Sequence, residues 1–248
     1  MKISGNTILV TGGGTGIGYA LAEKFAGLGN EVIICGRREN KLEEAKARIP
    51  ALHTIKCDIS KDAERQELCK QIAANFSGIN VLVNNAGIQR RIDLSRGADE
   101  LLSNEDEIEI NLRSQIYLAA RFVPMLIDKD ESAIINVSSG LGFVPIAAFP
   151  VYSATKAAIH SFTKSLRQQL KDTRIKVFEV IPPGVYDTEL KGKPMPKSDW
   201  SISAKEMADA VLEGLGNDQY EIAAGTARGW VNASRNELDK AFENTNNR

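Results

Sequence analysis

The stretch TILVTGGGTGIG, residues 7–18, joins a short apolar run to a turn rich in glycine. The run from Thr7 to Thr11 predicts a buried β-strand, and residues 17–28, followed by Gly29, predict a helix. Glycine-rich turns are common in ordinary loops. Between a strand and a helix, however, such a turn favours nucleotide binding, because the helix N-terminus attracts phosphate. We therefore expect this stretch to begin a nucleotide-binding α/β fold.

The glycines of this turn match neither the GxGxxG motif nor a Walker loop. Ile17 stands where the third glycine of a GxGxxG motif would fall, and Tyr19 stands where a Walker loop requires lysine. Glycines at 12, 16 and 18 instead give the pattern GxxxGxG. We expect Gly12 to permit the tight turn, Gly16 to let backbone N–H groups approach a pyrophosphate, and Gly18 to allow close packing of helix and strand.

Strand-like and helix-like segments alternate along the rest of the chain. Further strands are predicted at residues 31–35, 52–57, 81–83, 133–137, 175–181 and 220–223. Helices are predicted at residues 40–49, 61–76, 105–127, 151–171 and 205–215, and a polar helix at 232–244. The strands lack the polar alternation of half-buried strands, and repeated βα units imply a parallel sheet with right-handed crossovers.

This pattern predicts the class α/β and a doubly wound parallel β-sheet, a Rossmann-like three-layer αβα sandwich. No linker rich in Pro, Gly or Ser divides the alternation, so we expect a single domain over residues 1–248. The strands at 7–11, 81–83 and 133–137 are followed by Gly, Asn and Ser, residue types that ligand-binding loops require. In a doubly wound sheet these loops gather at the carboxyl edge.

The composition is that of an ordinary globular protein with almost balanced charge. Hydrophobic residues make up 43% of the 248, and 31 basic side chains face 32 acidic ones. A net charge of -1 gives no electrostatic reason to expect nucleic acid or an anionic membrane as a partner. No segment approaches the roughly 20 apolar residues of a membrane span, and residues 1–7 do not resemble a signal peptide. We expect a cytoplasmic protein.

Histidine and cysteine, the usual zinc ligands, are scarce in this sequence. There are two histidines, and Cys35, Cys57 and Cys69 show no metal-binding spacing. We therefore expect no metal site, and we interpret the cysteines as reduced thiols in packed positions.

The end of the second predicted strand bears on the choice between NADP(H) and NAD(H). An NAD site has a carboxylate there, which accepts hydrogen bonds from the ribose 2′-hydroxyl. This chain instead reads Cys35-Gly-Arg-Arg38, and arginine binds a 2′-phosphate through charge-assisted bonds. We therefore favour NADP(H) over NAD(H), with Arg37 and Arg38 at the phosphate. The alternative is that both arginines are solvated residues leading into a helix.

A second group of polar residues follows the later strands. Tyr152 and Lys156 are four apart in a predicted helix, so both side chains lie on one face. A YxxxK pair alone arises by chance in many proteins. Here, however, Ser139 follows the strand at 133–137, and the sequence NNAG at 84–87 follows the strand at 81–83.

These motifs make the chain resemble the short-chain dehydrogenase/reductase family. The resemblance covers roughly residues 5–190 and consists of TGxxxGxG at 11–18, Asp58, NNAG at 84–87, Asn111, Ser139, Tyr152, Lys156 and PGxxxT from Pro183 to Thr188. Several motifs in the right order and spacing make the match specific.

The resemblance implies a catalytic role for four of these residues. Tyr152 would donate a proton to a carbonyl oxygen or accept one from an alcohol, and Lys156, with the positive nicotinamide of the oxidised complex, would lower its pKa. Lys156 would also hold the nicotinamide ribose. Ser139 would hydrogen-bond the substrate oxygen, and Asn111 would support a water-linked proton relay. Asn111 as a helix cap is the alternative.

The resemblance also implies a set of cofactor contacts. Asp58 and Ile59 would flank the adenine, unless Asp58 only caps the turn at Ser60. The residues expected at the cofactor are Gly12, Gly14, Thr15, Gly16, Ile17, Gly18, Arg37, Arg38, Asp58, Ile59, Asn85, Ala86, Gly87, Tyr152, Lys156, Pro183, Gly184, Val185 and Thr188.

The substrate side of the sequence allows two interpretations. Arg90 and Arg91 could meet an anionic substrate, although solvated arginines are the simpler interpretation. Segment 189–203 is a short lid candidate. An apolar pocket wall and core packing explain five residues between the serine and the tyrosine equally well, namely Leu141, Phe143, Pro145, Ile146 and Phe149.

Three features depart from the family pattern. Pro182 replaces a common asparagine, Tyr186 replaces an aliphatic residue, and the region 225–248 lacks the glycine-rich ending of many members. The family implies a homodimer through helices near 112–127 and 152–170, or a homotetramer. The sequence is also similar to bacterial short-chain oxidoreductases associated with teichoic-acid D-alanylation, a similarity that implies no particular substrate.

We therefore expect an NADP(H)-dependent oxidoreductase that transfers hydride between the cofactor and a small-molecule carbonyl or secondary alcohol. The alternative is an NADP(H)-binding sensor or regulatory scaffold with little turnover. The complete set of Asn111, Ser139, Tyr152 and Lys156 favours the enzyme, because a sensor has no need for a proton-donating tyrosine.

Overall fold

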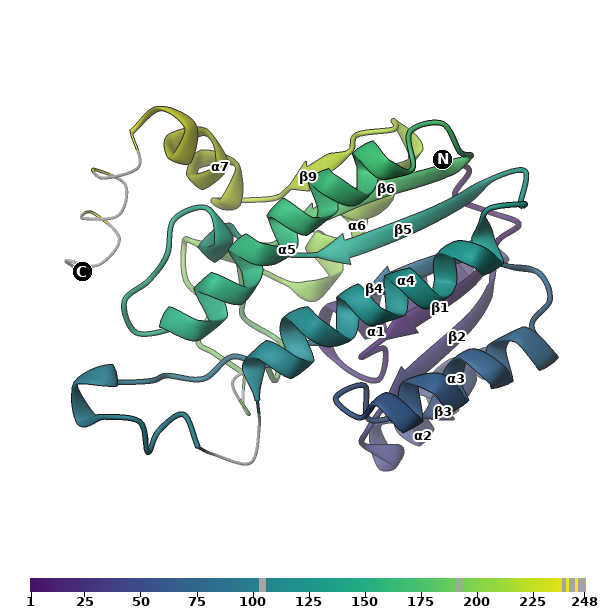
Figure 1. The fold of residues 1–248 in the computed structure, drawn as a ribbon, viewed down its shortest axis with the longest axis horizontal. Coiled ribbons are helices and arrows are strands. Elements are labelled where there is room, and N and C mark those ends of the chain that lie inside the picture. The colour runs from purple at the N-terminus through teal and green to yellow at the C-terminus, as the bar shows by residue number, and fades with distance from the viewer. Residues whose placement is uncertain (103–105, 191, 193, 238–239, 241–243, 245–248) are drawn as a thin grey trace.

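A parallel β-sheet forms the centre of the computed structural model, which describes residues 1–102, 106–190, 192, 194–237, 240 and 244 (Figure 1). Within these residues the sheet has seven strands in the order β3-β2-β1-β4-β5-β6-β9. Their bounds are β1 Thr7–Thr11, β2 Glu31–Gly36, β3 His53–Lys56, β4 Ile79–Asn84, β5 Ser132–Val137, β6 Ile175–Ile181 and β9 Glu221–Ala223.

Helices cover both faces of this sheet. In Figure 1 the helices α3 (Asp62–Asn75), α4 (Ser114–Leu126) and α5 (Pro150–Gln169) lie in front of the sheet. The helices α1 (Gly16–Gly27), α2 (Glu39–Arg48) and α6 (Ala204–Gly216) pack on the opposite face. This arrangement confirms the predicted doubly wound, Rossmann-like αβα sandwich.

Each central strand contributes side chains to two apolar cores. In β1, Ile8 and Val10 pack in the core with α1 and α6, whereas Leu9 packs in the core with α3 and α4. Because successive side chains of a strand point to opposite faces, a strand covered on both sides must be apolar at every position. This explains why the strand segments lack polar alternation.

The position of β1 in the middle of the sheet determines where a ligand can bind. The chain runs outward from β1 to β2 and β3, and then returns to place β4 on the other side of β1. The loops that leave β1 and β4 therefore run in opposite directions, which opens a crevice at their carboxyl ends. The glycine turn and the NNAG sequence lie at this point.

The helix predicted at 105–127 is not a continuous α-helix in the structure. A π-helical segment, Glu109–Arg113, leads into α4, and residue 105 lies outside the described residues. Arg65, only 2% exposed, holds this segment with an ion pair of 2.8 Å to Glu109, and Asn111 within it bonds to the backbone of Ile88. These long-range contacts are absent from the local sequence pattern, which shows only a helix.

The C-terminal region also differs from its prediction. The helix α7 spans Ala227–Asn236, so it begins before the predicted start at 232, and most of the residues after 237 lie outside the described part. A second, two-stranded sheet, β7 (Gly184–Val185) with β8 (Ser201–Ile202), was not predicted. It depends on Trp200, which packs so closely on Gly184 that an added Cβ would lie 2.2 Å from the indole.

None of the helices in the described residues combines the length and the apolar composition required to span a bilayer.

Candidate active site

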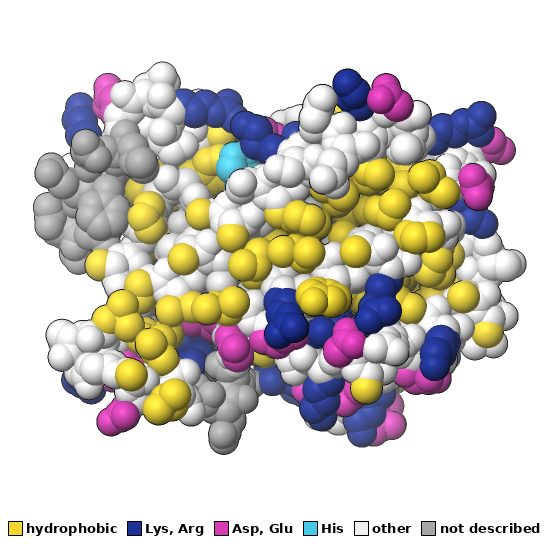
Figure 2. All heavy atoms as spheres, viewed as in Figure 1, with side chains coloured by type: hydrophobic (Ala, Val, Ile, Leu, Met, Phe, Trp, Pro, Cys, Tyr) yellow, Lys and Arg dark blue, Asp and Glu magenta, His cyan; other side chains and the backbone are white. Residues whose placement is uncertain are grey.

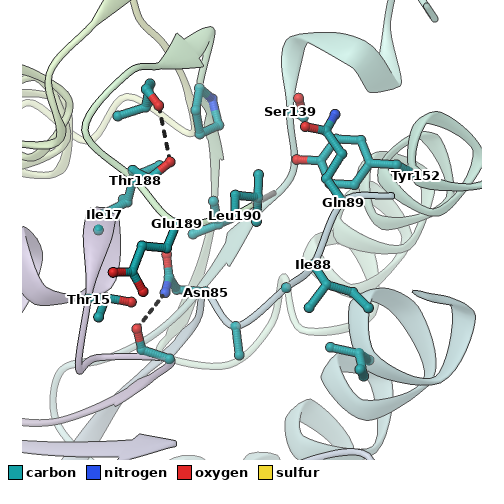
Figure 3. Close-up of a pocket in the computed structure, with 18 of the residues that line it drawn as sticks. Thr15, Ile17, Asn85, Ile88, Gln89, Ser139, Tyr152, Thr188, Glu189 and Leu190 are labelled. Atoms are coloured by element: carbon teal, nitrogen blue, oxygen red, sulfur yellow. Dashed lines mark hydrogen bonds between the residues drawn. The ribbon is translucent and has the colours of Figure 1, made fainter. Parts of the chain in front are cut away.

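One cleft at the carboxyl ends of the strands collects almost all of the residues that the sequence singles out. Its volume is about 880 Å³. Of the predicted catalytic and cofactor residues, all except Gly18 and Asn111 line it. Figure 3 shows that Thr15, Asn85 and Thr188 lie on one side of the cleft and Ser139 and Tyr152 on the other. The glycine turn and the catalytic candidates therefore share one continuous space.

The glycine turn approaches neighbouring backbone too closely for side chains. Gly12 has a φ of +65°, and a Cβ there would lie 2.9 Å from the Cα of Ala86. A Cβ on Gly18 would lie 2.4 Å from the carbonyl oxygen of Gly12, so α1 packs directly against the turn. A Cβ on Gly16 would lie 3.1 Å from the Cγ2 of Thr188. The turn is therefore narrow, with bare backbone toward the cleft.

Hydrogen bonds from Thr11 fix the NNAG loop to the end of β1. The Thr11 hydroxyl accepts hydrogen bonds from the backbone N–H groups of Asn85 and Ala86, both at 3.0 Å. The Asn85 side chain in turn donates to the Thr11 carbonyl oxygen at 2.8 Å. These bonds hold the NNAG loop, which lines the cleft, against the end of β1.

The catalytic candidates converge from β5 and α5. Ser139 begins a short 3-10 helix, Gly140–Gly142, and its hydroxyl accepts a hydrogen bond from the N–H of Leu141. Lys156 is 2% exposed, donates to the carbonyl oxygen of Val137 at 2.8 Å, and places its Nζ 5.6 Å from the ring centroid of Tyr152. The helical spacing of four thus puts the phenol and the amine side by side, as predicted.

Burial shifts the pKa values of both titratable groups away from their charged forms. It raises the pKa of Tyr152 to about 12, and the negative charge of Glu107 acts in the same direction, while a hydrogen bond with Ser139 opposes them. Burial lowers the pKa of Lys156 to about 8. Tyr152 is therefore a protonated phenol at neutral pH, which is the form that can donate a proton.

Asn111 lies behind the wall of the cleft, with no exposed surface. Its Oδ1 accepts from the N–H of Ile88, and its Nδ2 donates to the carbonyl oxygen of Ile88, both at 2.8 Å. Its Nδ2 also donates to Thr155, next to Lys156, at 3.4 Å. Asn111 is inside the π-helical segment and does not cap a helix. In this structure it positions the segment that follows NNAG.

The cofactor end contains contacts that local sequence could not show. Arg38 forms an ion pair of 2.6 Å with Glu189 and donates to the Thr15 hydroxyl at 3.1 Å, so it bridges the glycine turn and the segment after Thr188. Arg37 is exposed at the same edge. Asp58 lines the cleft and also accepts two hydrogen bonds from Ser60, so the turn-capping role considered above is present.

Sequence reasoning missed a buried carboxylate behind Ser139. Glu179 on β6 has no exposed surface, accepts a hydrogen bond from the Ser138 hydroxyl, and lies 2.8 Å from Nδ1 of His160. Glu221 is close to both residues, but it pairs with Arg235 at 2.7 Å. The network supports the end of β5, where Ser139 begins. Its sequence signal is a charged residue inside the apolar strand IKVFEVI.

The substrate side of the cleft combines apolar and polar walls. Of the five residues left open between wall and core, Leu141, Ile146 and Phe149 line the cleft, whereas Phe143 packs against Ile181 and Val231 in a small core. Further lining residues that sequence reasoning did not single out for the pocket are Gln89, Ile110 and Trp230. Several residues of the lid candidate at 189–203 line the cleft, namely Glu189, Leu190, Gly192, Met195 and Trp200. Residues 191 and 193 lie outside the described part.

Comparison with known proteins agrees with this architecture. The family model described as short chain dehydrogenase matches residues 6–198. The chain belongs to the short-chain dehydrogenase family. It is 45% identical over 249 residues to the uncharacterized oxidoreductase DltE of Bacillus subtilis (strain 168), and the match covers 99% of this chain and 98% of that protein.

Solved structures of the short-chain dehydrogenase family share the fold over almost the whole chain. A short chain dehydrogenase from Burkholderia cenocepacia J2315 in complex with NADP has a TM-score of 0.84 and 27% identity, and covers 99% of both chains. A 3-ketoacyl-(acyl-carrier-protein) reductase from Brucella melitensis complexed with NADH has a TM-score of 0.80 and 25% identity, and covers 92% of this chain and 99% of that chain.

The buried amine of Lys156 predicts a measurable pH dependence of stability. Replacing Lys156 with Met should raise the free energy of unfolding at pH 7 by about 1–3 kcal/mol, because burying an ammonium is unfavourable and one pKa unit is worth about 1.4 kcal/mol. Between pH 8 and 10.5 the unfolded lysine binds more protons than the folded one, so the wild type gains stability as the pH rises and the difference shrinks.

Urea unfolding of the wild type and the variant at pH 7, 8, 9 and 10 measures this difference. Replacement of the exposed Lys70 with Met is the control and should leave the stability nearly unchanged at each pH. A difference between wild type and Lys156→Met that stays constant up to pH 10 would contradict a lowered pKa for Lys156.

Proposed function

We propose that this protein is an NADP(H)-dependent oxidoreductase that interconverts a carbonyl compound and a secondary alcohol. One observation carries the proposal. Ser139, Tyr152 and Lys156 lie together in the same cleft that the glycine turn lines at its other side. Membership of the short-chain dehydrogenase family supports the same reaction class.

The residues of the cleft fit a nicotinamide dinucleotide. At Gly12 and Gly18 the backbone contacts leave no room for a Cβ, and the turn leads into the N-terminus of α1, which favours phosphate. When bound, the nicotinamide supplies or accepts the hydride. Pro183, Gly184 and Val185 would meet its amide, and the Lys156 ammonium would hold the adjoining ribose hydroxyls.

Tyr152 is the proton donor in the direction of carbonyl reduction. Its raised pKa keeps the phenol protonated at neutral pH, so a proton is available at the Oη. The Ser139 hydroxyl would donate a hydrogen bond to the substrate oxygen as that oxygen gains negative charge. The Lys156 ammonium beside the ring would stabilise the phenolate that remains after proton transfer. Alcohol oxidation reverses these proton movements.

Arginine at the end of β2 supports NADP(H) as the preferred cofactor. Arg37 and Arg38 line the cleft where a carboxylate would otherwise receive the ribose hydroxyls. Arg38 already forms its ion pair with the Glu189 carboxylate, which shows that an anionic oxygen fits against this guanidinium. A 2′-phosphate would replace that carboxylate with a group of higher charge. Solved relatives occur with NADP and with NADH, so this preference is our proposal.

Turnover with Tyr152→Phe as the control tests the reaction. Consumption of NADPH over a panel of ketones, aldehydes and quinones should be measurable in the wild type and should fall by about 10²- to 10⁴-fold in the variant, because the variant lacks the proton donor. Binding of NADPH should stay nearly the same. Tight NADPH binding with no turnover over the panel would instead favour a cofactor-binding sensor.

The cofactor preference has a separate test. Replacement of Arg37 with Ala should raise the KM for NADPH by roughly 10- to 100-fold, since hydrogen bonds to charged groups are worth about 1.5–3 kcal/mol, and should leave the KM for NADH within about twofold. Steady-state kinetics with both cofactors measure the two effects. Equal losses for NADPH and NADH would show that the arginine does not read the 2′-phosphate.

We also propose a homodimer, or a homotetramer built from it, that uses α4 and α5. Figure 2 shows an apolar patch over these two helices, and its exposed residues include Tyr117, Pro124, Ile127, Ala154 and Ala157. Adjacent apolar residues on a surface favour association. Light scattering should give at least twice the 27.0 kDa of one chain, and the variant Tyr117→Glu should shift the particle toward 27.0 kDa. A wild type that scatters as a monomer would contradict the proposal.

The single domain and the cytoplasmic location remain part of the proposal. The two apolar cores lie on opposite faces of one sheet, which supports one domain over the chain. Cys35, Cys57 and Cys69 are free thiols, and this suits a reducing compartment.

A further inference from the structure

The segment Gln89-Arg90-Arg91 lines a hollow at the open end of the catalytic cleft. This hollow measures about 480 Å³, and its lining residues are Gln89, Arg90, Arg91 and Phe149, all of which also line the main cleft. Gln89 bonds through its N–H to the carbonyl oxygen of Leu190, and the next residue, Ile92, bonds to Ala148. The segment is therefore anchored at both ends by backbone hydrogen bonds.

The three side chains of this segment have different surroundings. Gln89 points toward Ser139 and Tyr152, as Figure 3 shows, and Arg91 lies 5.8 Å from the ring centroid of Phe149 in the pocket wall. The guanidinium of Arg90 instead donates to the carbonyl oxygen of Glu100. Gln89 and Arg91 thus form one polar side of the substrate space, from the catalytic hydroxyl groups to the opening.

The side-chain amide of Gln89 opens into the cleft without a protein partner. The residue is 8% exposed, and its amide makes no hydrogen bond to any residue within the described ranges. An amide that faces the cleft can exchange its hydrogen bonds with water for hydrogen bonds with a ligand, and this amide lies next to Tyr152.

Arg91 is a cation that no carboxylate of the described residues neutralises. The neighbouring acids have other partners: Asp93 and Glu100 pair with Arg96, and Glu107 accepts the N–H of Arg90. The Arg91 guanidinium lies over the ring of Phe149, 5.8 Å from the ring centroid, and this contact helps to hold the side chain at the opening of the cleft. A planar cation held in this way suits a carboxylate or phosphate.

We propose that Gln89 and Arg91 bind the anionic group of the substrate, a carboxylate or a phosphate carried by a small carbonyl compound. This inference rests on the proposed function and adds its substrate class. Arg91 attracts and orients the anion at the opening, while Gln89 hydrogen-bonds an oxygen near the reacting carbon. A neutral analogue would leave Arg91 unpaired and therefore binds less well.

Binding to the inactive Tyr152→Phe variant, saturated with NADPH, tests the site without turnover. Isothermal titration compares acetoacetate with methyl acetoacetate, 5-oxohexanoate with its methyl ester, and dihydroxyacetone phosphate with dihydroxyacetone. In at least one pair the anion should bind at least tenfold more tightly than its neutral partner. The first two pairs respond if the site takes a carboxylate, and the third responds if it takes a phosphate.

Adding Arg91→Ala to this variant should remove the difference, and adding Gln89→Leu should weaken the anion severalfold with NADPH binding unchanged. The matched control is Arg96→Ala, five residues further along the chain, whose side chain is 72% exposed and pairs with Asp93 and Glu100; it should keep the full difference. Equal binding within all three pairs, or a difference that persists in Arg91→Ala, would overturn the proposal.

The wild-type enzyme separates this inference from the proposed function. For each pair we compare kcat/KM for the anion with kcat/KM for its neutral partner. If Arg91→Ala removes the preference for the anion and leaves kcat/KM for the neutral compound unchanged, the result supports both the proposed function and the anion site. An anion preference in binding without turnover of any carbonyl compound by the wild type would refute the proposed function and leave the anion site intact.

Discussion

The close approach of backbone at the end of β1 is the constraint on which the active site depends. Gly12 and Gly18 lie so near Ala86 and each other that neither position accepts a Cβ. The Thr11 hydroxyl locks the same junction by accepting two N–H groups of the NNAG loop. Because β1 and β4 are neighbours at the centre of the sheet, this junction lies at the topological switch point. The cleft opens from there toward both the cofactor end and the substrate end.

Burial of the Lys156 amine opposes its charged form and therefore costs stability at neutral pH. Burial also opposes ionisation of Tyr152, which stays a neutral phenol and carries no such cost. The two apolar cores on the faces of the sheet offset the cost at Lys156. Buried polar networks support the site from behind: Asn111 holds the backbone of Ile88, and Glu179 holds Ser138. The ends of β4 and β5 therefore connect the cleft residues to the core of the fold.

Arginine side chains lie at both ends of this cleft, and they differ in whether a carboxylate of the protein pairs with them. At the cofactor end, Arg38 is already paired with Glu189 on the segment after Thr188, so binding of an anion there must compete with a carboxylate of the protein. At the proposed substrate end, Arg91 has no such competitor among the described residues and lies over the ring of Phe149. Ser139 and Tyr152 lie between these ends, beside the amide of Gln89. The small anionic carbonyl compound that we propose as substrate matches this distribution of charge.

The sequence by itself determined the class of fold, the order of the strands and helices, and the positions of the glycine turn, Ser139, Tyr152 and Lys156. These features are local: apolar runs specify buried strands, and a spacing of four places two side chains on one helix face. Only the tertiary structure decided the π-helical segment at Glu109–Arg113, the pair of Arg38 with Glu189, and the exposure of Gln89 to the catalytic groups. Such contacts join residues far apart in the chain, and their partners depend on how strands and helices pack in space, which no local pattern of residues encodes.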